Sequence, residues 1–378
     1  MDFGSLLSKS IVFLLSQVYT DIIYLMKPDT SVFLINVNTG YRKKDKTSII
    51  GENLNANLIE GELTCLLGPN GAGKSTLLRT LSAFLPPISG EIQFYGRPLS
   101  DYTTNELSRL IGVVLTDRLD VRDMPVSDLV ALGRSPYTGF FGKLNHKDRE
   151  IVQEALMMTG TVALADRMVH TLSDGERQKV LIAKTLAQQT PIILLDEPTA
   201  FLDYPSKVEL MHLLRNLARK TRKTIFLSTH DLELALQVAD RIWLIDKEKG
   251  LTTGIPEDLA LNGLLSKYFE RDGIFFSIET GLFQVKEQTE KDIPATGPEH
   301  IVRLVSKSFA RHGIRIVPVE KGNNPDVFPQ IIIRPDKEKE FCFEYFWHPD
   351  NQTKQVYSSI ETLTAAVINS EGKNESGI

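Results

Sequence analysis

Cysteine is scarce in this chain of 378 residues, which contains only Cys65 and Cys342. The two thiols have no metal-type spacing, and so few cysteines in so long a chain argue against a disulfide framework. A reducing, cytosolic setting fits this composition best. Blocks of five or more basic residues are also absent, and the formal net charge is −5. The chain therefore has no general electrostatic attraction to nucleic acid.

An unbroken apolar run long enough for a membrane helix, about 20 residues, is lacking as well. The nearest candidate is Ile11–Met26, which is interrupted by polar residues such as Ser16 and Asp21. Its N-terminal flank is only weakly basic, unlike that of a signal peptide. We interpret residues 1–30 as an N-terminal extension, either a peripheral helix or a disordered segment. A start assigned too early and a membrane or export function are the alternatives.

The residues that are present describe a globular protein with room for two hydrophobic cores. Hydrophobic residues make up 42% of the chain and charged residues 24%, which is typical of soluble domains. Short apolar runs alternate with segments of helical periodicity, and this alternation predicts an α/β sheet with ligand groups at the strand ends. Strands are expected at Ser31–Tyr41, Leu54–Ile59, Leu63–Leu67, Ile111–Leu115, Ile192–Leu195 and Thr224–Ser228. Helices are expected at Ser75–Phe84, Asp148–Met158, Glu176–Gln189 and Pro205–Arg219.

The residues beyond 285 predict a second, smaller domain. Glu287–Glu299 is polar and contains two prolines, which suits a linker, so we place a linker at 286–299. A small α+β accessory domain is expected at 300–370, followed by a frayed tail at 371–378. Its expected helices are Ile301–Arg311 and Ser358–Asn369, and its expected strands are Ile314–Val319, Gln330–Arg334 and Phe341–Trp347.

The run GPNGAGKST at 68–76 follows a predicted strand, precedes a predicted helix and fits the phosphate-binding P-loop pattern. Its glycines allow successive backbone N–H groups to surround phosphates, and the helix adds its positive end. Lys74 can reach the β- and γ-phosphates, and Ser75 can ligate Mg²⁺. The predicted nucleotide-binding residues are Gly68, Pro69, Asn70, Gly71, Ala72, Gly73, Lys74, Ser75 and Thr76.

Three further polar residues follow apolar strands. In IILLDEP, Asp196 can hold Mg²⁺ through water, and Glu197 can orient or deprotonate the attacking water. In LSTHD, His230 can hydrogen-bond a γ-phosphate as a neutral imidazole. Each would be an ordinary strand end by itself, but beside the P-loop they indicate nucleotide hydrolysis. Lys74, Glu197 and His230 are the predicted catalytic residues.

The P-loop, LSDGERQ (Leu172–Gln178), IILLDEP and LSTHD follow one another in an order that resembles the ATP-binding cassette (ABC) family. The resemblance covers about 31–285. It implies the P-loop NTPase fold of an ABC nucleotide-binding domain, with a RecA-like core, an antiparallel β subdomain and a helical subdomain at about 117–190. It also implies ATP and Mg²⁺ as cofactors.

In that family the signature motif presents Ser and Gly backbone groups to the nucleotide held by a second subunit. The resemblance therefore assigns this contact to Ser173 and Gly175. It places Asp203, in TAFLD, at the dimer seam, and Tyr41, in GYR, under the adenine ring.

The signature departs from the usual LSGGQ at two positions. Asp174 replaces the first glycine and Glu176 replaces the glutamine. Both carboxylates must point away from a bound phosphate or have partners, because otherwise they weaken nucleotide-driven closure. Ser173 and Glu176 also fit a helix capping box, which is the structural interpretation of the same residues.

A second departure lies after the strand Ile111–Leu115, where the family has a glutamine and this chain has Thr116. Thr116 is a candidate Mg²⁺ ligand beside Ser75 and Asp196. The alternative is that Thr116 only ends the strand and that water completes the metal shell.

The stretch Met124–Val152, above all GRSPY at Gly133–Tyr137, resembles the ATPase subunits of iron–siderophore, haem and cobalamin importers. That branch implies a homodimer of ATPase subunits, two transmembrane permease subunits and an extracytoplasmic substrate-binding protein that acts indirectly. It implies a peripheral position at the cytoplasmic face of the inner (plasma) membrane, with no nucleic acid as partner. Two other hypotheses are a non-transport ATPase switch in DNA repair, translation or cluster assembly, and a binding module without turnover.

Overall fold

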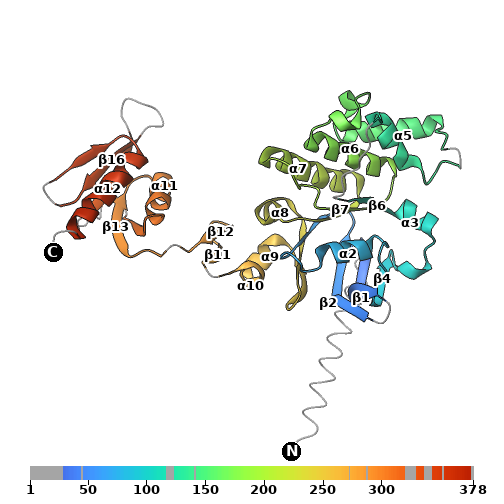
Figure 1. Ribbon diagram of the computed structural model, residues 1–378, viewed down its shortest axis with the longest axis horizontal. Coiled ribbons are helices and arrows are strands. Elements are labelled where there is room, and N and C mark those ends of the chain that lie inside the picture. Colours follow the sequence, from blue (N-terminus) through green and yellow to red (C-terminus); the bar gives the residue numbers. More distant parts are fainter. Residues whose placement is uncertain are drawn as a thin grey trace, which may run out of the picture. The chain divides into compact units, whose positions relative to one another are not determined.

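The computed structural model of the protein describes residues 29–43, 46–115, 123–139, 142–271, 273–286, 288–319, 329–335, 343–350 and 353–375. They form two compact units (Figure 1). The first unit comprises the described residues up to Glu270 together with Phe276–Phe283, and the second comprises Arg271–Phe275 and the described residues from Gln284 onward. In these ranges no helix is long and apolar enough to cross a membrane. Almost all of the N-terminal extension predicted at 1–30 lies outside them.

A six-stranded sheet forms the centre of the first unit. Its strands lie in the order β10 (Gly250–Gly254), β9 (Arg241–Asp246), β3 (Leu63–Leu67), β8 (Thr224–Ser228), β7 (Ile192–Asp196) and β6 (Ile111–Val114). All neighbours are parallel except β9 and β10. β3 and β8 have the bounds predicted from the sequence. The carboxyl ends of β3, β8 and β7 therefore meet at one edge of the sheet, where ligands bind in open α/β folds.

The two faces of this sheet belong to two hydrophobic cores. Successive side chains of a strand point to opposite faces, so Leu66, Leu194 and Phe226 pack toward the N-terminal strands while Leu195 and Ile225 pack toward the helices. All of these side chains are buried. Because burying one such side chain stabilises by about 1.5–3 kcal/mol, the continuous apolar runs of these strands are explained by burial on both faces.

An antiparallel sheet covers one of these cores. Its strands lie in the order β2 (Lys46–Ile59), β1 (Thr30–Lys43), β4 (Ser89–Phe94) and β5 (Arg97–Pro98). β2 begins eight residues before the predicted start at Leu54, because it pairs with β1 from Lys43 opposite Lys46 to Thr30 opposite Ile59. Backbone pairing thus extends the strand beyond its hydrophobic part.

Helices surround the central sheet. They are α2 (Lys74–Leu81), α3 (Thr104–Leu110), α7 (Tyr204–Thr221), α8 (Leu232–Val238), α9 (Pro256–Leu261) and α10 (Leu264–Phe269), with a 3-10 turn at Leu99–Asp101. α2 ends before the predicted Phe84, because Ala83 adopts a left-handed φ of 60° and the Ser82 hydroxyl donates to the Leu78 carbonyl.

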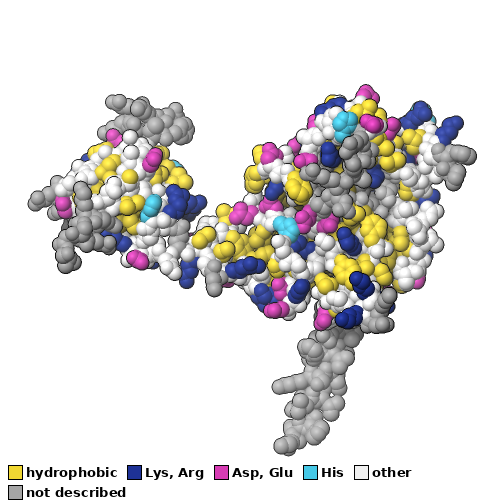
Figure 2. Space-filling view, viewed as in Figure 1, with side chains coloured by type: hydrophobic (Ala, Val, Ile, Leu, Met, Phe, Trp, Pro, Cys, Tyr) yellow, Lys and Arg dark blue, Asp and Glu magenta, His cyan; other side chains and the backbone are white. Residues whose placement is uncertain are grey.

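A separate helical part is inserted between β6 and β7. It contains α4 (Val126–Ala131), α5 (His146–Met158) and α6 (Asp174–Ala187), with 3-10 turns at Leu132–Arg134, Val162–Leu164 and Val169–Thr171. Figure 1 shows α5 and α6 at one end of the first unit, with β1 and β2 at the opposite end. Figure 2 shows Lys and Arg interspersed with Asp and Glu over the visible surface.

The second unit is a five-stranded sheet with two helices on one face. The strands lie in the order β14 (Ile314–Pro318), β13 (Lys291–Thr296), β15 (Gln330–Pro335), β16 (Phe343–His348) and β17 (Gln355–Tyr357). The helices are α11 (Glu299–Ala310) and α12 (Ile360–Glu375). Val305 and Phe309 of α11 and Leu363 of α12 share one core with alternate residues of the strands. A two-stranded hairpin, β11 (Ile274–Ser277) and β12 (Leu282–Val285), precedes this sheet along the chain.

Two predictions for this region are wrong. The segment predicted as a linker at 286–299 contains β13, which lies between β14 and β15. Its alternate residues Ile293 and Ala295 are fully buried, a pattern too short and too close to Pro294 to be recognised in the sequence. The tail predicted to fray from Glu371 is helical as far as Glu375, because helix propagation adds one hydrogen bond per residue once a packed helix exists.

Candidate nucleotide-binding site

The loop between β3 and α2 is shaped by glycines where a side chain does not fit. A Cβ on Gly68 would lie 2.2 Å from the Ile245 carbonyl oxygen, and a Cβ on Gly73 would lie 2.8 Å from Cγ2 of Ile50. Gly71 and Gly73 also have positive φ values of 78° and 101°, which other residues rarely adopt. The loop therefore brings bare backbone close to whatever binds there.

The helix that follows is open at its N-terminus. α2 begins at Lys74, and Gly73 at its N-cap supplies no side-chain hydrogen bond. The first backbone N–H groups of a helix lack partners within it and favour anions. Asn70, Gly71 and Ser75 are exposed around this end. The predicted P-loop thus has the geometry of a phosphate cradle.

Lys74 is held inside this loop by carbonyl groups. Its Nζ donates to the Gly68 carbonyl at 2.7 Å and to the Pro69 carbonyl at 3.3 Å, and lies 3.5 Å from Nδ1 of His230. The residue is only 5% exposed. Burial lowers the pKa of the Lys74 ammonium, and the carboxylates of Glu197 and Asp196 oppose that shift. The ammonium is therefore pre-positioned beside the acidic end of β7.

Tyr41 lies beside the P-loop, near the end of β1. Its hydroxyl is 3.3 Å from Oγ1 of Thr76. The residue is 42% exposed, so part of the ring remains open for contact with a base. This position agrees with the prediction of an adenine contact without testing it.

The acidic end of β7 is organised by a serine of β8 that the sequence did not identify. Ser228 Oγ donates to Oδ1 of Asp196 at 2.6 Å and accepts from the backbone N–H of Glu197 at 3.0 Å. Glu197 has a φ of 47°, a backbone conformation that is strained for a residue with a side chain. Parallel pairing of Asp196 with Ser228 explains the contact. The sequence signal that could have indicated this role is a serine two residues before His230.

His230 joins the acidic end of β7 to the P-loop. Its Nε2 lies 2.5 Å from Oε1 of Glu197, while its Nδ1 lies 3.5 Å from Nζ of Lys74. The three predicted catalytic residues therefore meet at the ends of three strands. His230 is 47% exposed and Glu197 29% exposed at the side chain, so both remain accessible to a water molecule or a ligand.

A pocket of about 460 Å³ opens next to these residues. Glu197 and His230 line it together with the segment after β7 and the start of α8. The further lining residues are Thr199, Ala200, Phe201, Leu202, Lys207, Asp231, Leu232, Glu233 and Phe283. Lys207 Nζ contacts Oδ2 of Asp231 at 3.1 Å, so these two charges of the rim are paired.

The signature motif begins α6 with a capping box. Ser173 Oγ accepts from the Glu176 N–H at 3.3 Å, and Oε2 of Glu176 accepts from the Ser173 N–H at 2.9 Å. Arg167 Nη1 lies 3.1 Å from Oε1 of Glu176. The Ser173 backbone N–H, the Ser173 hydroxyl and Arg167 hold the pKa of Glu176 below its usual value. Glu176, one of the two differences from the usual signature, therefore has its carboxylate paired. The other difference, Asp174, is exposed.

Ser173, Gly175 and Asp203 line a second pocket, of about 380 Å³. Asp203 is the N-cap of α7, where its carboxylate accepts from the Ser206 N–H at 3.1 Å. No described P-loop residue lines this pocket. The structure thus brings the predicted site residues together in two groups, one around Lys74 and one around Ser173.

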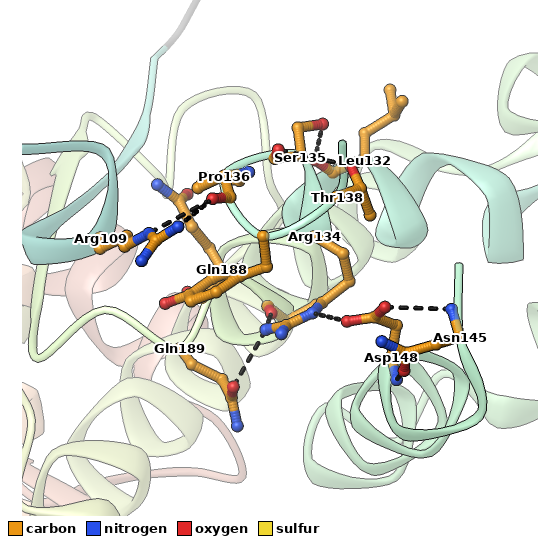
Figure 3. A network of polar contacts seen from close by, with 12 residues as sticks. Arg109, Leu132, Arg134, Ser135, Pro136, Thr138, Asn145, Asp148, Gln188 and Gln189 are labelled. Atoms are coloured by element: carbon orange, nitrogen blue, oxygen red, sulfur yellow. Dashed lines mark hydrogen bonds and ion pairs between the residues drawn. The ribbon is translucent and has the colours of Figure 1, made fainter. Parts of the chain in front are cut away.

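The C-terminal end of α6 is anchored by the GRSPY run, as Figure 3 shows. Arg134 Nη1 donates to the Ala187 carbonyl at 2.8 Å, and its Nε donates to Oδ1 of Asp148 at 2.9 Å. Arg134 and Asp148 are 4% and 3% exposed. The guanidinium also lies 4.1 Å from the ring centroid of Tyr137. A buried cation thus meets the negative end of the signature helix and joins it to α5.

The same turn also contacts α3, the helix that precedes β6. Arg109 of α3 donates through Nη2 to the Pro136 carbonyl at 2.9 Å (Figure 3). Gln188 Nε2 donates to the Ser108 carbonyl at 2.6 Å, and the Tyr137 hydroxyl donates to the Gln188 carbonyl at 3.1 Å. The sequence pattern marked the GRSPY run but did not predict the contacts around it, because they join residues up to 80 positions apart.

The oxygen donors near the loop suit Mg²⁺, which prefers few protein ligands completed by water and phosphate oxygens. Ser75 offers an exposed hydroxyl at the start of α2, and Asp196 offers a carboxylate at the end of β7. No group of three or more His, Cys, Asp or Glu suited to a metal occurs among the described residues. Thr116, the third predicted ligand, lies outside the described residues.

A parallel sheet whose strand ends carry a glycine-rich phosphate loop, an acidic pair and a histidine defines a P-loop nucleotide-binding protein. A family model described as ABC transporter matches residues 51–200. An uncharacterized ABC transporter ATP-binding protein of Methanocaldococcus jannaschii is 37% identical over 257 residues, which cover 68% of this chain and 87% of the relative. The ferric enterobactin transport ATP-binding protein FepC of Escherichia coli is 37% identical over 220 residues, which cover 58% and 81%.

Among solved structures, the dimeric post-hydrolysis state of an ATP-binding cassette bound to ADP and phosphate matches with a TM-score of 0.50. Its sequence is 30% identical, and the match covers 57% of this chain and 94% of that chain. The chain belongs to the ABC transporter family and is an ABC-type ATPase. The predicted family and fold class are confirmed.

Proposed function

We propose that this chain binds and hydrolyses ATP to energise an ABC importer for iron–siderophore, haem or cobalamin-type chelates. The observation that carries the proposal is the cluster of Lys74, His230 and Glu197 around the ends of β3, β8 and β7. Similarity to a ferric enterobactin transport subunit supports the substrate class. So does the GRSPY run at Gly133–Tyr137.

In this proposal the P-loop backbone at 68–76 and Lys74 bind the phosphates of ATP, and the ring of Tyr41 lies under the adenine. Ser75 and Asp196 hold Mg²⁺, with Thr116 as a further candidate ligand. The cation supplies charge neutralisation at the β- and γ-phosphates. Ser228 supports this arrangement by fixing the carboxylate of Asp196.

Hydrolysis in this proposal depends on two side chains. Glu197 orients or deprotonates the attacking water, and its accessible carboxylate lies beside the cluster at the end of β7. His230 bridges that carboxylate and the phosphate loop, since its two ring nitrogens lie near Glu197 and Lys74. A neutral imidazole in this position can donate to a γ-phosphate oxygen.

The separation of the two groups of site residues supports a homodimer. Ser173 and Gly175 of one copy complete the nucleotide site of the second copy, and Asp203 lies at the seam between them. Two permease subunits receive the resulting movement at the cytoplasmic face of the inner membrane. An extracytoplasmic binding protein delivers the chelate, and nucleic acid has no part.

The proposal is tested by purifying the tagged full-length chain from detergent-solubilised membranes. We expect a polytopic membrane protein at comparable amounts, and phosphate release that is lost in Lys74→Ala. In proteoliposomes, ferric siderophore, haem or cobalamin supplied with its binding protein should stimulate that release. Tight co-purification with ribosomes or DNA would contradict the proposal in favour of a non-transport switch. Phosphate release at background with the membrane partner present would indicate a binding module.

A further inference from the structure

The second unit contains a groove between its two helices. α11 and α12 pack side by side on one face of the five-stranded sheet (Figure 1). The groove has a volume of about 680 Å³, and its lining residues come from α11, from the two residues after α11 and from α12. Small-molecule sites commonly have volumes of about 300–1,000 Å³. The groove therefore has the size of a ligand site, and the second unit forms it alone.

Much of the groove lining is apolar. Leu304 of α11 is 52% exposed, and Ile360 and Ile368 of α12 are partly exposed and line the same groove. Apolar surface gains free energy when a ligand displaces the water that covers it. The groove therefore favours a ligand with an apolar body.

Two buried hydroxyl groups also line the groove. Ser308 Oγ of α11 and Thr364 Oγ1 of α12 lie 3.0 Å apart, and the two residues are 8% and 5% exposed. This one hydrogen bond uses only one of the two hydroxyl protons, and neither hydroxyl bonds to another group that the structure describes. Other helix hydroxyls, such as that of Thr80, donate to the carbonyl one turn earlier. Because a buried donor without an acceptor is costly, the second proton is suited to an acceptor atom of a ligand.

The charged residues of the lining give the groove an excess of positive charge. Lys307 and Arg311 both line it, and neither forms an ion pair with a side chain that the structure describes. Glu361 is the one acidic residue in the described lining. Cations without a protein partner attract an anionic group, so the groove offers positive charge beside its apolar surface.

We propose that the groove between α11 and α12 binds a small organic anion, with its apolar body against Leu304 and Ile368 and its anionic group at Lys307 and Arg311. This site belongs to the second unit and does not depend on the proposed importer function. A second copy of this chain is a poorer occupant. In a twofold contact the same patch meets itself, so Lys307 and Arg311 of two copies would face one another.

The test compares two fluorescent probes with the same apolar body, the anion 8-anilinonaphthalene-1-sulfonate and the neutral N-phenyl-1-naphthylamine. Each probe is titrated into the nucleotide-free full-length chain. Lys307→Gln with Arg311→Gln should weaken binding of the sulfonate by about tenfold or more, because charge-assisted contacts are lost, and should leave binding of the neutral probe unchanged. Arg303→Gln with Arg315→Gln is the matched control. It changes the net charge equally at two ion-paired arginines outside the groove and should leave both affinities unchanged.

Two further variants test the apolar surface and the hydroxyl pair. Leu304→Gln should weaken binding of both probes, because both use the same apolar contact. Ser308→Ala with Thr364→Val should weaken binding of the sulfonate alone, because it removes the hydroxyl donor. Replacing both partners of a hydrogen bond by apolar groups changes stability little, and thermal unfolding checks that each variant is folded.

Equal sulfonate affinities in the groove variant and the matched control would overturn the proposal, since the probe would then respond to net charge or bind elsewhere. If the groove variant does not fold, wild-type affinity of Leu304→Gln for both probes overturns the proposal by itself. Sedimentation velocity of the nucleotide-free chain tests the other occupant. A wild-type dimer that becomes a monomer in Leu304→Gln would show that a second copy fills the groove, and would also overturn the proposal.

Discussion

The P-loop group and the signature group are both parts of one proposed nucleotide site, but they are built differently. In the P-loop group, Lys74 is buried and bonded to carbonyls, and it lies beside His230 and Glu197 from two other strands. In the signature group, Ser173 and Asp203 are exposed and bond mainly to their own helices.

This difference in burial and in contacts shows that the P-loop group is assembled within one chain, whereas the signature group is left exposed. Contacts across three strands hold the P-loop group together within a single copy. The signature group is shaped by helix caps, and Arg134 anchors the other end of α6. Its polar groups are exposed in the single copy, and in the proposed homodimer another copy would cover them.

The largest expected effect is a loss of hydrolysis at the P-loop group, with ATP binding retained. Glu197→Gln should slow phosphate release by roughly 10²–10⁴-fold, because general-base catalysis contributes about that much. Equilibrium binding of ATP should persist. Glu233→Gln is the matched control, since this exposed carboxylate lines the same pocket and should retain activity. Unchanged turnover in Glu197→Gln would remove Glu197 from the base position.

The next effect should be confined to the signature group. Arg134→Met leaves Asp148, which is 3% exposed, without its buried cation, and breaking such a pair costs about 3 kcal/mol of the free energy of unfolding. Urea denaturation measures this loss, and ATP binding by the folded protomer should be preserved. Arg109→Met, at an exposed arginine that contacts the same turn, should cost less than about 1 kcal/mol. Equal losses in the two variants would contradict the role assigned to Arg134.

A smaller loss is expected where the GRSPY turn packs on α6. A Cβ on Gly133 would lie 2.2 Å from the Lys184 carbonyl oxygen and 3.1 Å from Cβ of Ala187. Gly133→Ala should therefore cost about 2 kcal/mol through overpacking, measured by thermal unfolding. Gly139→Ala meets nothing within 4 Å and serves as the control. If the two alanine variants melt together, the packing described at this turn is wrong.

The smallest effect concerns the capping box of the signature helix. Glu176→Ala should cost about 1 kcal/mol at neutral pH, and Glu176→Gln less, because the amide keeps the hydrogen bonds. The folded state holds the pKa of Glu176 below its usual value of 4.5, so its charged contribution is present above that value and disappears as pH falls through the folded-state pKa. Unfolding free energies of wild type and Glu176→Gln should therefore converge in acid. A difference that grows toward acid would reverse this sign.

Much of the P-loop group could be predicted because its signals are local. The glycines of 68–76, the acidic end of β7 and His230 each stand next to an apolar strand that the sequence marks clearly. The parallel arrangement of these strands then brings the residues together. Ser228 was missed because its role depends on lying opposite Asp196 in the neighbouring strand, which no local pattern reveals.

The signature group and the second unit were harder to predict because their contacts are distant in the sequence. Arg134 lies in a turn that is polar by sequence, yet it is buried against Asp148 and the end of α6. β13 looked like a linker because only Ile293 and Ala295 carry the buried alternation. The linker predicted at 286–299 is wrong, and the boundaries of the cassette predicted at 31–285 remain a prediction.

The most direct test of a nucleotide site shared between two copies mixes two inactive variants. Lys74→Ala disables the P-loop group and Ser173→Arg disables the signature group. Half of the dimers in an equal mixture are mixed, and each mixed dimer has one intact site, so phosphate release should recover to about one quarter of the wild-type rate. A mixture no more active than the two variants measured separately would contradict the account.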